Sequence, residues 1–142
     1  MKKALFLLIG AVLLFGFQPG DRLDDETMRA LGIRDKGVYV IDFFASWCHS
    51  CEKELPLLNT LKNARIIGVD VDENVEDGRR FVKELGLGFD VIEDPEGAIV
   101  SRFDPAGIPA IYIIKDGKVA GTIIGARPDI DRAIASALER LR

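Results

Sequence analysis

Residues 38–51 read VYVIDFFASWCHSC, and this stretch decides the fold. Its first half, residues 38–44, is β-branched and aromatic with a single charge, which is typical of a strand covered on both faces. Leucines recur at helical spacing from Leu55 onward, so a helix is expected to follow the cysteines and to run as far as Lys62. The two cysteines therefore lie where a buried strand turns into a helix.

The next segment repeats this alternation of strand and helix. Residues 65–71 are an apolar run that predicts a second strand. A helix that carries Phe81 and Leu85 is expected after it and should end at Gly86, because glycine readily adopts the left-handed conformation that closes a helix. Strands that alternate with helices in this way indicate parallel pairing.

The last third of the chain predicts shorter strands and a final helix. The strands are expected at residues 89–92, 111–114 and 119–124. The last two flank KDGK at residues 115–118, a strong signal for a hairpin turn. Pro128 can open a final helix, because the first turn of a helix does not need its missing N–H. The expected fold class is therefore α/β, with a central mixed β-sheet flanked by helices.

The composition limits the class of protein. A chain of 142 residues, 48% of them apolar, can build one packed domain. The formal net charge is −4, and no block of basic residues could follow a phosphate backbone. We therefore expect no nucleic-acid partner.

The amino terminus has the pattern of a secretory signal. Two lysines precede an apolar run at residues 4–17, which is shorter than the roughly 20 residues that a transmembrane helix needs. Signal peptidase prefers small residues before its cut, and residues 16–19 match this preference poorly. We expect residues 1–20 to be a signal peptide or an N-terminal membrane anchor, and residues 21–142 to form a domain in the periplasm or on the outer face of the cytoplasmic membrane. A buried amino-terminal helix of a cytosolic protein is the alternative.

Cys48 and Cys51 are the only cysteines, and their spacing places both sulfurs on the same side of the first helical turn. The free N–H groups and partial positive charge of a helix amino terminus stabilise a thiolate at Cys48. We therefore expect Cys48 to attack a partner disulfide and Cys51 to resolve the mixed disulfide that results. The alternatives are a structural disulfide contributing about 2 kcal/mol, a zinc site and two cysteines without a role. Zinc needs about four ligands, and besides the two cysteines the chain has only one histidine, His49, which lies between them.

Residues 40–51, VIDFFASWCHSC, resemble the active-site region of thioredoxins. Further motifs are similar to the extracytoplasmic TlpA/ResA-like branch of the thioredoxin superfamily: ELP at residues 54–56, GVDVD at 68–72, FVKELG at 81–86 and GIPA at 107–110. The resemblance covers about residues 36–125 and implies a thioredoxin-like fold with a redox-active disulfide between Cys48 and Cys51. Residues 21–37 are too short for the amino-terminal hairpin that is usual in that branch.

The resemblance also implies roles for residues around the dithiol. It implies that Pro109 follows a cis peptide bond and that its loop faces the cysteines. Ile108 would then offer its backbone to an extended partner segment, while Trp47 would shield Cys48 and present an apolar surface. His49 completes the residues expected to contact the substrate. The alternatives are an ordinary trans proline, simple core packing of the tryptophan and an exposed histidine without influence.

Two acidic residues are candidates for proton transfer. Asp42 is a lone charge in an apolar strand, where burial should raise the pKa of its carboxyl group. The resemblance implies that Asp42 corresponds to the buried aspartate that assists Cys51 in thioredoxins. It likewise implies that Glu54 corresponds to the glutamate that many TlpA/ResA-like proteins use instead. The alternatives are a solvent-facing Asp42 and an exposed Glu54 that only complements the helix dipole.

These observations predict a protein-disulfide oxidoreductase that reduces exported proteins, such as apocytochromes during cytochrome c maturation. The resemblance implies that a membrane-embedded protein supplies its electrons. We expect no cofactor, no metal and a monomer. The alternatives are a disulfide-forming oxidase or isomerase, a peroxidase on the same fold, and a noncatalytic module that handles copper or haem. The presence of only two methionines argues against the last of these.

Overall fold

The computed structural model describes residues 15–142, so the greater part of the expected leader lies outside the described residues. Within residues 15–142, no helix is long and apolar enough to cross a membrane. The strands are β1 (Val38–Phe44), β2 (Arg65–Asp70), β3 (Asp90–Glu93), β4 (Ala110–Lys115) and β5 (Lys118–Ile124). The helices are α1 (Asp25–Ala30), α2 (His49–Leu58), α3 (Val75–Leu85), α4 (Val100–Phe103) and α5 (Ile130–Glu139).

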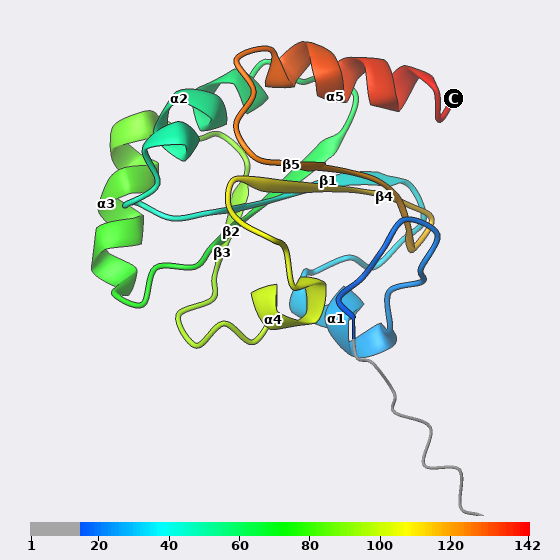
Figure 1. Cartoon of the computed structure of the whole chain (residues 1–142), viewed down its shortest axis with the longest axis horizontal. Coiled ribbons are helices and arrows are strands. Elements are labelled where there is room, and N and C mark those ends of the chain that lie inside the picture. The colour runs from blue at the N-terminus through cyan, green and yellow to red at the C-terminus, as the bar shows by residue number, and fades with distance from the viewer. Residues whose placement is uncertain (1–14) are drawn as a thin grey trace, which may run out of the picture.

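The strands form one mixed sheet in the order β3-β2-β1-β4-β5. β1 pairs in parallel with β2 and antiparallel with β4, which confirms the predicted mixed sheet. In Figure 1, α2 and α5 lie on one face of the sheet, α1 and α4 lie on the other, and α3 stands beside α2. β1 is therefore the central strand and is covered on both faces.

The side chains of β1 alternate between two cores, as the period of two in a strand requires. Ile41 and Phe43 pack in the core on the α1 and α4 side. Val40 and Phe44 pack in clusters that include leucines of α2. All four side chains are fully buried. Asp42 lies between Val40 and Phe44 in this alternation, so it belongs to the face that α2 covers.

α2 is shorter than predicted and ends at Leu58 rather than at Lys62. The side chain of Asn59 leaves the helix and donates a hydrogen bond to the carbonyl of Gly86 at 3.1 Å. Hydrogen bonds of the tighter three-residue type close the last turn. Leu61 nevertheless packs into the core, which explains why the helical spacing of leucines continues beyond the end of the helix.

The sequence pattern does not predict α1 and α4, which have only six and four residues. Each depends on an aspartate that binds free N–H groups at its start. The carboxylate of Asp24 accepts from the Thr27 N–H at 2.7 Å. The carboxylate of Asp94 accepts from the N–H groups of Ile99 and Val100 at 3.1 and 2.9 Å. Helices this short show no apolar periodicity that a sequence reading could detect.

The other elements fall close to their predicted positions. α3 ends at Gly86, which has the expected left-handed conformation with φ of 62°. β3 begins one residue later than predicted, at Asp90, and α5 begins at Ile130, two residues after Pro128. Both central residues of the β4–β5 turn have positive φ, as its aspartate-glycine sequence predicts.

The chain before α1 lies along the body of the domain. The ring of Phe17 contacts that of Phe103 in α4, with centroids 5.0 Å apart. The N–H of Gly20 donates to the carbonyl of Val119 in β5 at 2.8 Å. This segment therefore packs from residue 17 onward against α4 and the outer strand of the sheet.

We predict opposite effects for two glycine substitutions. Gly86→Ala should lower the free energy of unfolding by about 1 kcal/mol, because an L-residue pays an energetic penalty of that order in the left-handed conformation. Gly121→Ala in β5 should raise it by about 0.5 kcal/mol, because the space is open and alanine restricts the unfolded chain. Urea unfolding of the oxidised protein measures both. A loss of stability of the same size in both variants would contradict the assignment of Gly86 as a required cap.

Candidate active site

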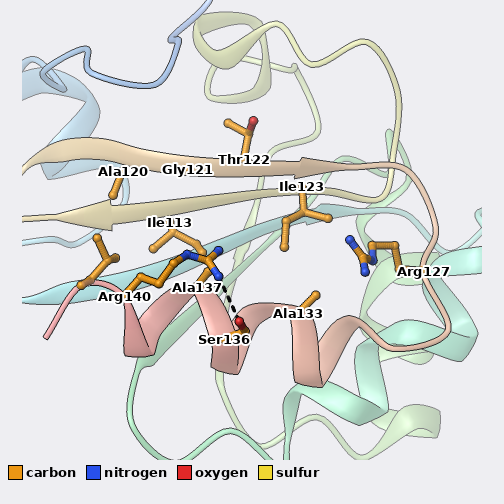
Figure 2. A pocket seen from close by; sticks show the side chains of 11 residues that line it. Ile113, Ala120, Gly121, Thr122, Ile123, Arg127, Ala133, Ser136, Ala137 and Arg140 are labelled. Carbon is orange, nitrogen blue, oxygen red and sulfur yellow. Dashed lines mark hydrogen bonds between the residues drawn. The ribbon is translucent and has the colours of Figure 1, made fainter.

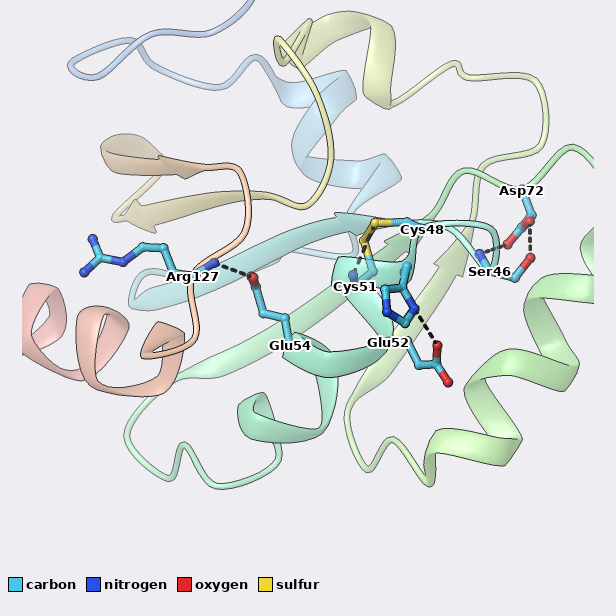
Figure 3. The surroundings of a disulfide bond; sticks show 8 residues. Ser46, Cys48, Cys51, Glu52, Glu54, Asp72 and Arg127 are labelled. Atoms are coloured by element: carbon cyan, nitrogen blue, oxygen red, sulfur yellow. Dashed lines mark hydrogen bonds and ion pairs between the residues drawn. A yellow bond between two sulfur atoms is a disulfide. The ribbon is translucent and has the colours of Figure 1, made fainter.

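Cys48 and Cys51 form a disulfide, as predicted, with Cα atoms 5.2 Å apart. Cys48 is the amino-terminal cap of α2, and its sulfur accepts a hydrogen bond from the Cys51 N–H at 3.2 Å. Figure 3 shows the disulfide where the chain passes from β1 into α2. Cys48 is 8% exposed, whereas Cys51 is fully buried. A partner therefore approaches the disulfide from the side of Cys48.

The loop between β1 and Cys48 is held by a hydrogen bond within the loop and by two hydrogen bonds to Asp72, which follows β2. The Cys48 N–H donates to the carbonyl of Ala45 at 3.1 Å. The N–H and hydroxyl of Ser46 both donate to the carboxylate of Asp72, at 2.8 and 2.6 Å (Figure 3). Trp47 is 69% exposed, so the alternative of simple core packing is wrong. The loop thus presents a large apolar side chain directly before Cys48.

Asp72 is a residue of this site that the sequence pattern does not single out. It follows β2, and the parallel pairing of Phe44 with Asp70 ends β1 and β2 at the same edge of the sheet. The loops after the two strands are therefore neighbours. The signal that could have found Asp72 is the alternation of two aspartates at the end of an apolar strand, since a carboxylate there can reach the adjacent loop.

The peptide bond between Ile108 and Pro109 is cis, as the resemblance implies, and the trans alternative is wrong. Ile108 packs against the buried cluster that contains both cysteines. The N–H of Gly125, after β5, donates to the carbonyl of Pro109 at 2.8 Å and so ties this loop to the end of β5. The loop before β4 is thereby placed beside the disulfide.

Asp42 is fully buried, so the solvent-facing alternative is wrong. Among the described residues, neither oxygen of its carboxyl group has a hydrogen-bond partner. Burial, and to a smaller extent the negative charge of Glu54, raises the pKa of Asp42 well above its ordinary value. This carboxyl group can therefore hold a proton under conditions in which an exposed aspartate is ionised.

Glu54 lies one turn after Cys51 on the buried face of α2 and is 3% exposed, so the exposed alternative is wrong. One carboxylate oxygen accepts a hydrogen bond from the Arg127 N–H at 3.4 Å (Figure 3), and the other has no partner among the described residues. Burial raises the pKa of Glu54 to about 7, although the Arg127 N–H opposes the shift. Glu54 also borders a cavity of about 410 Å³ together with Lys53 and Pro128.

His49 follows the nucleophile candidate, and its side chain is exposed at the surface. Its side chain is 77% exposed, and its Nδ1 is 3.4 Å from the carboxylate of Glu52, which is itself 56% exposed. An exposed pair of this kind contributes little energy. His49 is therefore exposed to solvent, as the alternative assumed, while its influence on Cys48 stays a prediction.

A second concavity lies away from the dithiol, between β5 and α5 (Figure 2). It has a volume of about 470 Å³, and neither cysteine lines it. Small and apolar side chains form most of its wall, and at one end the guanidinium of Arg140 donates to the Ser136 hydroxyl at 3.0 Å. The candidate site is therefore the disulfide and its surroundings.

Two features of the backbone define the class of protein. A disulfide at the amino terminus of α2 and a cis-proline loop lie at the same end of a five-stranded mixed sheet. Within residues 15–142, no group of three His, Cys, Asp or Glu side chains is placed to hold a metal ion. The fold and the site are those of a thioredoxin-like protein with an active-site dithiol. Residues 18–122 match the sequence profile of the AhpC/TSA family, and the chain belongs to that family.

Curated relatives match most of this chain. The thiol-disulfide oxidoreductase ResA of Bacillus thuringiensis strain Al Hakam is 34% identical over 110 residues. The matched part covers 72% of this chain and 63% of the relative. This chain therefore spans less than two thirds of the length of the relative.

Solved structures share the fold. A candidate DsbE thiol:disulfide interchange protein from Chlorobium tepidum has a TM-score of 0.75 at 23% identity, covering 88% of this chain and 98% of that one. A secreted disulfide oxidoreductase from Mycobacterium tuberculosis has a TM-score of 0.61 at 21% identity, covering 70% and 81%. These likenesses confirm the predicted thioredoxin-like fold.

The two buried acids predict how stability depends on pH. Both carboxyl groups have a raised pKa in the folded protein, so above about pH 4 the unfolded chain gives up protons that the folded protein keeps, and stability falls as the pH rises. Asp42→Asn should therefore raise the free energy of unfolding of the oxidised protein at pH 8, and should raise it much less at about pH 4. Glu54→Gln should act in the same direction, because its pKa is also raised in the folded protein. Urea unfolding at the two pH values measures the difference.

The exposed acid of α2 provides the control. Glu52→Gln removes an exposed carboxylate from the same helix without changing a buried group, so the difference between its effects at the two pH values should be much smaller. If Asp42→Asn gave no larger gain at pH 8 than at pH 4, the raised pKa of Asp42 would be refuted.

Proposed function

We propose that the protein is a thiol:disulfide oxidoreductase that reduces disulfides of exported proteins by dithiol exchange through Cys48 and Cys51. The observation that carries this proposal is the unequal exposure of two bonded sulfurs at a helix amino terminus. The sulfur of Cys48 is accessible to a partner, whereas the sulfur of Cys51 is buried and can react only with Cys48. The names of the ResA relative and of the secreted oxidoreductase support the same activity.

Exchange begins with the reduced protein. The thiolate of Cys48 attacks one sulfur of the partner disulfide, the partner S–S bond breaks, and its leaving thiolate takes up a proton. The thiol of Cys51 then loses its proton and attacks Cys48. The mixed disulfide breaks, the second partner thiolate leaves, and the Cys48–Cys51 disulfide forms. Two electrons have passed from the dithiol to the partner.

The start of α2 favours the thiolate form of Cys48. As the cap residue, Cys48 has its sulfur at the positive end of the helix dipole. Its sulfur also accepts the N–H of Cys51 at 3.2 Å, a hydrogen bond that is stronger when the acceptor is charged. Both effects lower the free energy of the attacking species at neutral pH.

Asp42 and Glu54 supply the proton acceptor that Cys51 needs. Cys51 and Glu54 lie on the buried face of α2, and Asp42 belongs to the face of β1 that this helix covers. An acid can take a proton from a thiol and return it efficiently when its pKa lies near the working pH. The pKa of Glu54, about 7, meets this condition, and its negative charge in turn acts on Asp42.

The surface around Cys48 suits an extended partner segment. Trp47 provides an exposed apolar side chain on one side, and the Ile108–Pro109 loop lies on the other. The backbone of Ile108 can pair with the partner as a short added strand. His49 lies at the rim of this surface, where it can contact the partner.

The proposed setting is the periplasm or the outer face of the cytoplasmic membrane. The leader pattern at residues 4–17 supports export, with residues 1–20 as signal peptide or anchor and residues 21–142 as the domain. The secreted mycobacterial structure is consistent with this setting. We further propose that its clients include apocytochromes in cytochrome c maturation and that a membrane-embedded protein supplies its electrons. We propose that the protein is a monomer.

Substitution of each cysteine tests the exchange mechanism. The reduced wild-type protein should cleave a model disulfide such as that of insulin, and Cys48→Ser should abolish turnover because the nucleophile is lost. Cys51→Ser should instead accumulate a mixed disulfide at Cys48, detectable by mass spectrometry without reductant. Ser50→Ala, between the two cysteines, is the control and should retain turnover. Full turnover by Cys48→Ser would rule out the mechanism.

The position of His49 bears on the direction of exchange. Its imidazole is exposed and pairs with Glu52 at the surface, and water screens the effect of an exposed charge on Cys48. We therefore predict a reduction potential nearer to about −270 mV, typical of thioredoxin, than to the roughly −120 mV of a strong oxidant. His49→Ala should shift it by less than about 30 mV, a tenfold change in the equilibrium constant. Equilibration with glutathione, followed through the fluorescence of the single tryptophan, measures both values.

A different result would change the assignment. A potential above about −170 mV that His49→Ala lowers strongly would make the protein an oxidase or isomerase.

A further inference from the structure

The end of β2 carries two buried carboxyl groups that the exchange mechanism does not use. Asp70 is 2% exposed and Asp72 is 4% exposed. Among the ion pairs within residues 15–142, none involves either of them. Two full negative charges in such a place, without a cation, are costly.

Hydrogen bonds connect these carboxyl groups to the loop before Cys48. Ser46 donates its N–H and its hydroxyl to the two oxygens of Asp72, at 2.8 and 2.6 Å (Figure 3). The N–H of Asp72 donates in turn to a carboxylate oxygen of Asp70 at 2.9 Å. A continuous path of hydrogen bonds therefore runs from Asp70 through Asp72 to Ser46, two residues before Cys48.

α3 is shaped to cover Asp70. A Cβ atom at Gly78, near the start of α3, would lie 1.6 Å from a carboxylate oxygen of Asp70. Two non-bonded atoms cannot come so close. Glycine inside a helix is about 1 kcal/mol less favourable than alanine. The glycine at this position is explained by the carboxyl group over which the helix closes.

Charged groups face Asp70 from each element packed against it. Glu93 pairs with it across the sheet from β3, and Arg79 and Lys83 of α3 line the same small cavity of about 270 Å³. Arg79 is engaged with the Glu93 carboxylate at 2.6 Å. Burial raises the pKa of Asp70 to about 7. The side chain of Asp72 and the negative charges of Asp72 and Glu93 act in the same direction, whereas the hydrogen bond from the Asp72 N–H opposes the shift.

We propose that Asp70 and Asp72 are positioning residues, that Asp70 holds a proton beside Asp72, and that loss of this proton loosens the loop carrying Trp47 and Cys48. With the proton present, Asp70 donates to Asp72, and Asp72 keeps both of its oxygens on Ser46. Without the proton, the two buried carboxylates repel each other. Asp72 can then move away from Asp70 only if its hydrogen bonds to Ser46 are distorted or broken. The proposal rests on the proposed function in one respect, namely that Cys48 is the nucleophile which this loop presents.

The fluorescence of Trp47 in the oxidised protein tests the proposal. Trp47 is the only tryptophan, and disulfide-bonded cysteines do not titrate, so the signal reports this loop alone. All variants carry His49→Gln, which removes the neighbouring imidazole. In this background we expect the emission maximum to shift with a single step between about pH 6 and about pH 8.

Two matched amides identify the group responsible. Asp70→Asn keeps an N–H donor for Asp72 but cannot lose a proton, so the step should disappear. Glu54→Gln removes the other described carboxyl group with a pKa of about 7, and the step should remain. A step that persists in Asp70→Asn, a step that disappears in Glu54→Gln, or no step in the background would each overturn the proposal.

A measurement on the unaltered chain decides the matter if Asp70→Asn does not fold. The carbon-13 resonance of the Asp70 carboxyl group should titrate with a midpoint above about pH 6, and a midpoint at or below that value would overturn the proposal. Neither measurement requires turnover. Failure of the positioning proposal and failure of the oxidoreductase activity are therefore observed separately.

Discussion

The burial of β1 on both faces is the constraint on which the rest of the structure depends. β2 pairs with β1 from Tyr39 to Phe44 and β4 pairs with it from Val38 to Phe43, so the strand is fixed in the sheet close to its carboxyl end. A short loop leads from there into the first turn of α2. The parallel neighbour ends at the same edge and brings Asp72, while the antiparallel neighbour begins there and brings Pro109. Three segments that are distant in the sequence thus meet around the sulfur of Cys48.

The chemistry of this site works against the stability of the fold. Asp42, Glu54 and Asp70 are buried carboxyl groups with raised pKa values, and a core of apolar residues in their place would hold together better. An exposed carboxyl group, however, has a pKa near 4 and holds almost no proton at neutral pH. Burial is therefore what allows these carboxyl groups to hold a proton near neutral pH.

Much of the sheet could be predicted from the sequence, because its strands are apolar runs bounded by clear turn residues. The disulfide followed from the spacing of two cysteines, and the cis bond at Pro109 from a resemblance. The end of α2 could not be predicted, since it depends on a hydrogen bond between Asn59 and Gly86, 27 residues apart. The contact of Ser46 with Asp72 likewise depends on the order of strands in the sheet, which no local pattern contains.

The unequal burial of the two sulfurs also governs how the reduced protein meets peroxide. A small oxidant reaches the 8% exposed Cys48 before the fully buried Cys51, and it converts the Cys48 thiolate to a sulfenic acid with release of hydroxide. The thiol of Cys51 lies one helical turn away and closes the disulfide with water as the leaving group. Irreversible sulfinic acid forms only if a second peroxide arrives before this closure. The geometry that directs electrons to a partner in the proposed function would thus also confine oxidation to a state that reduction restores.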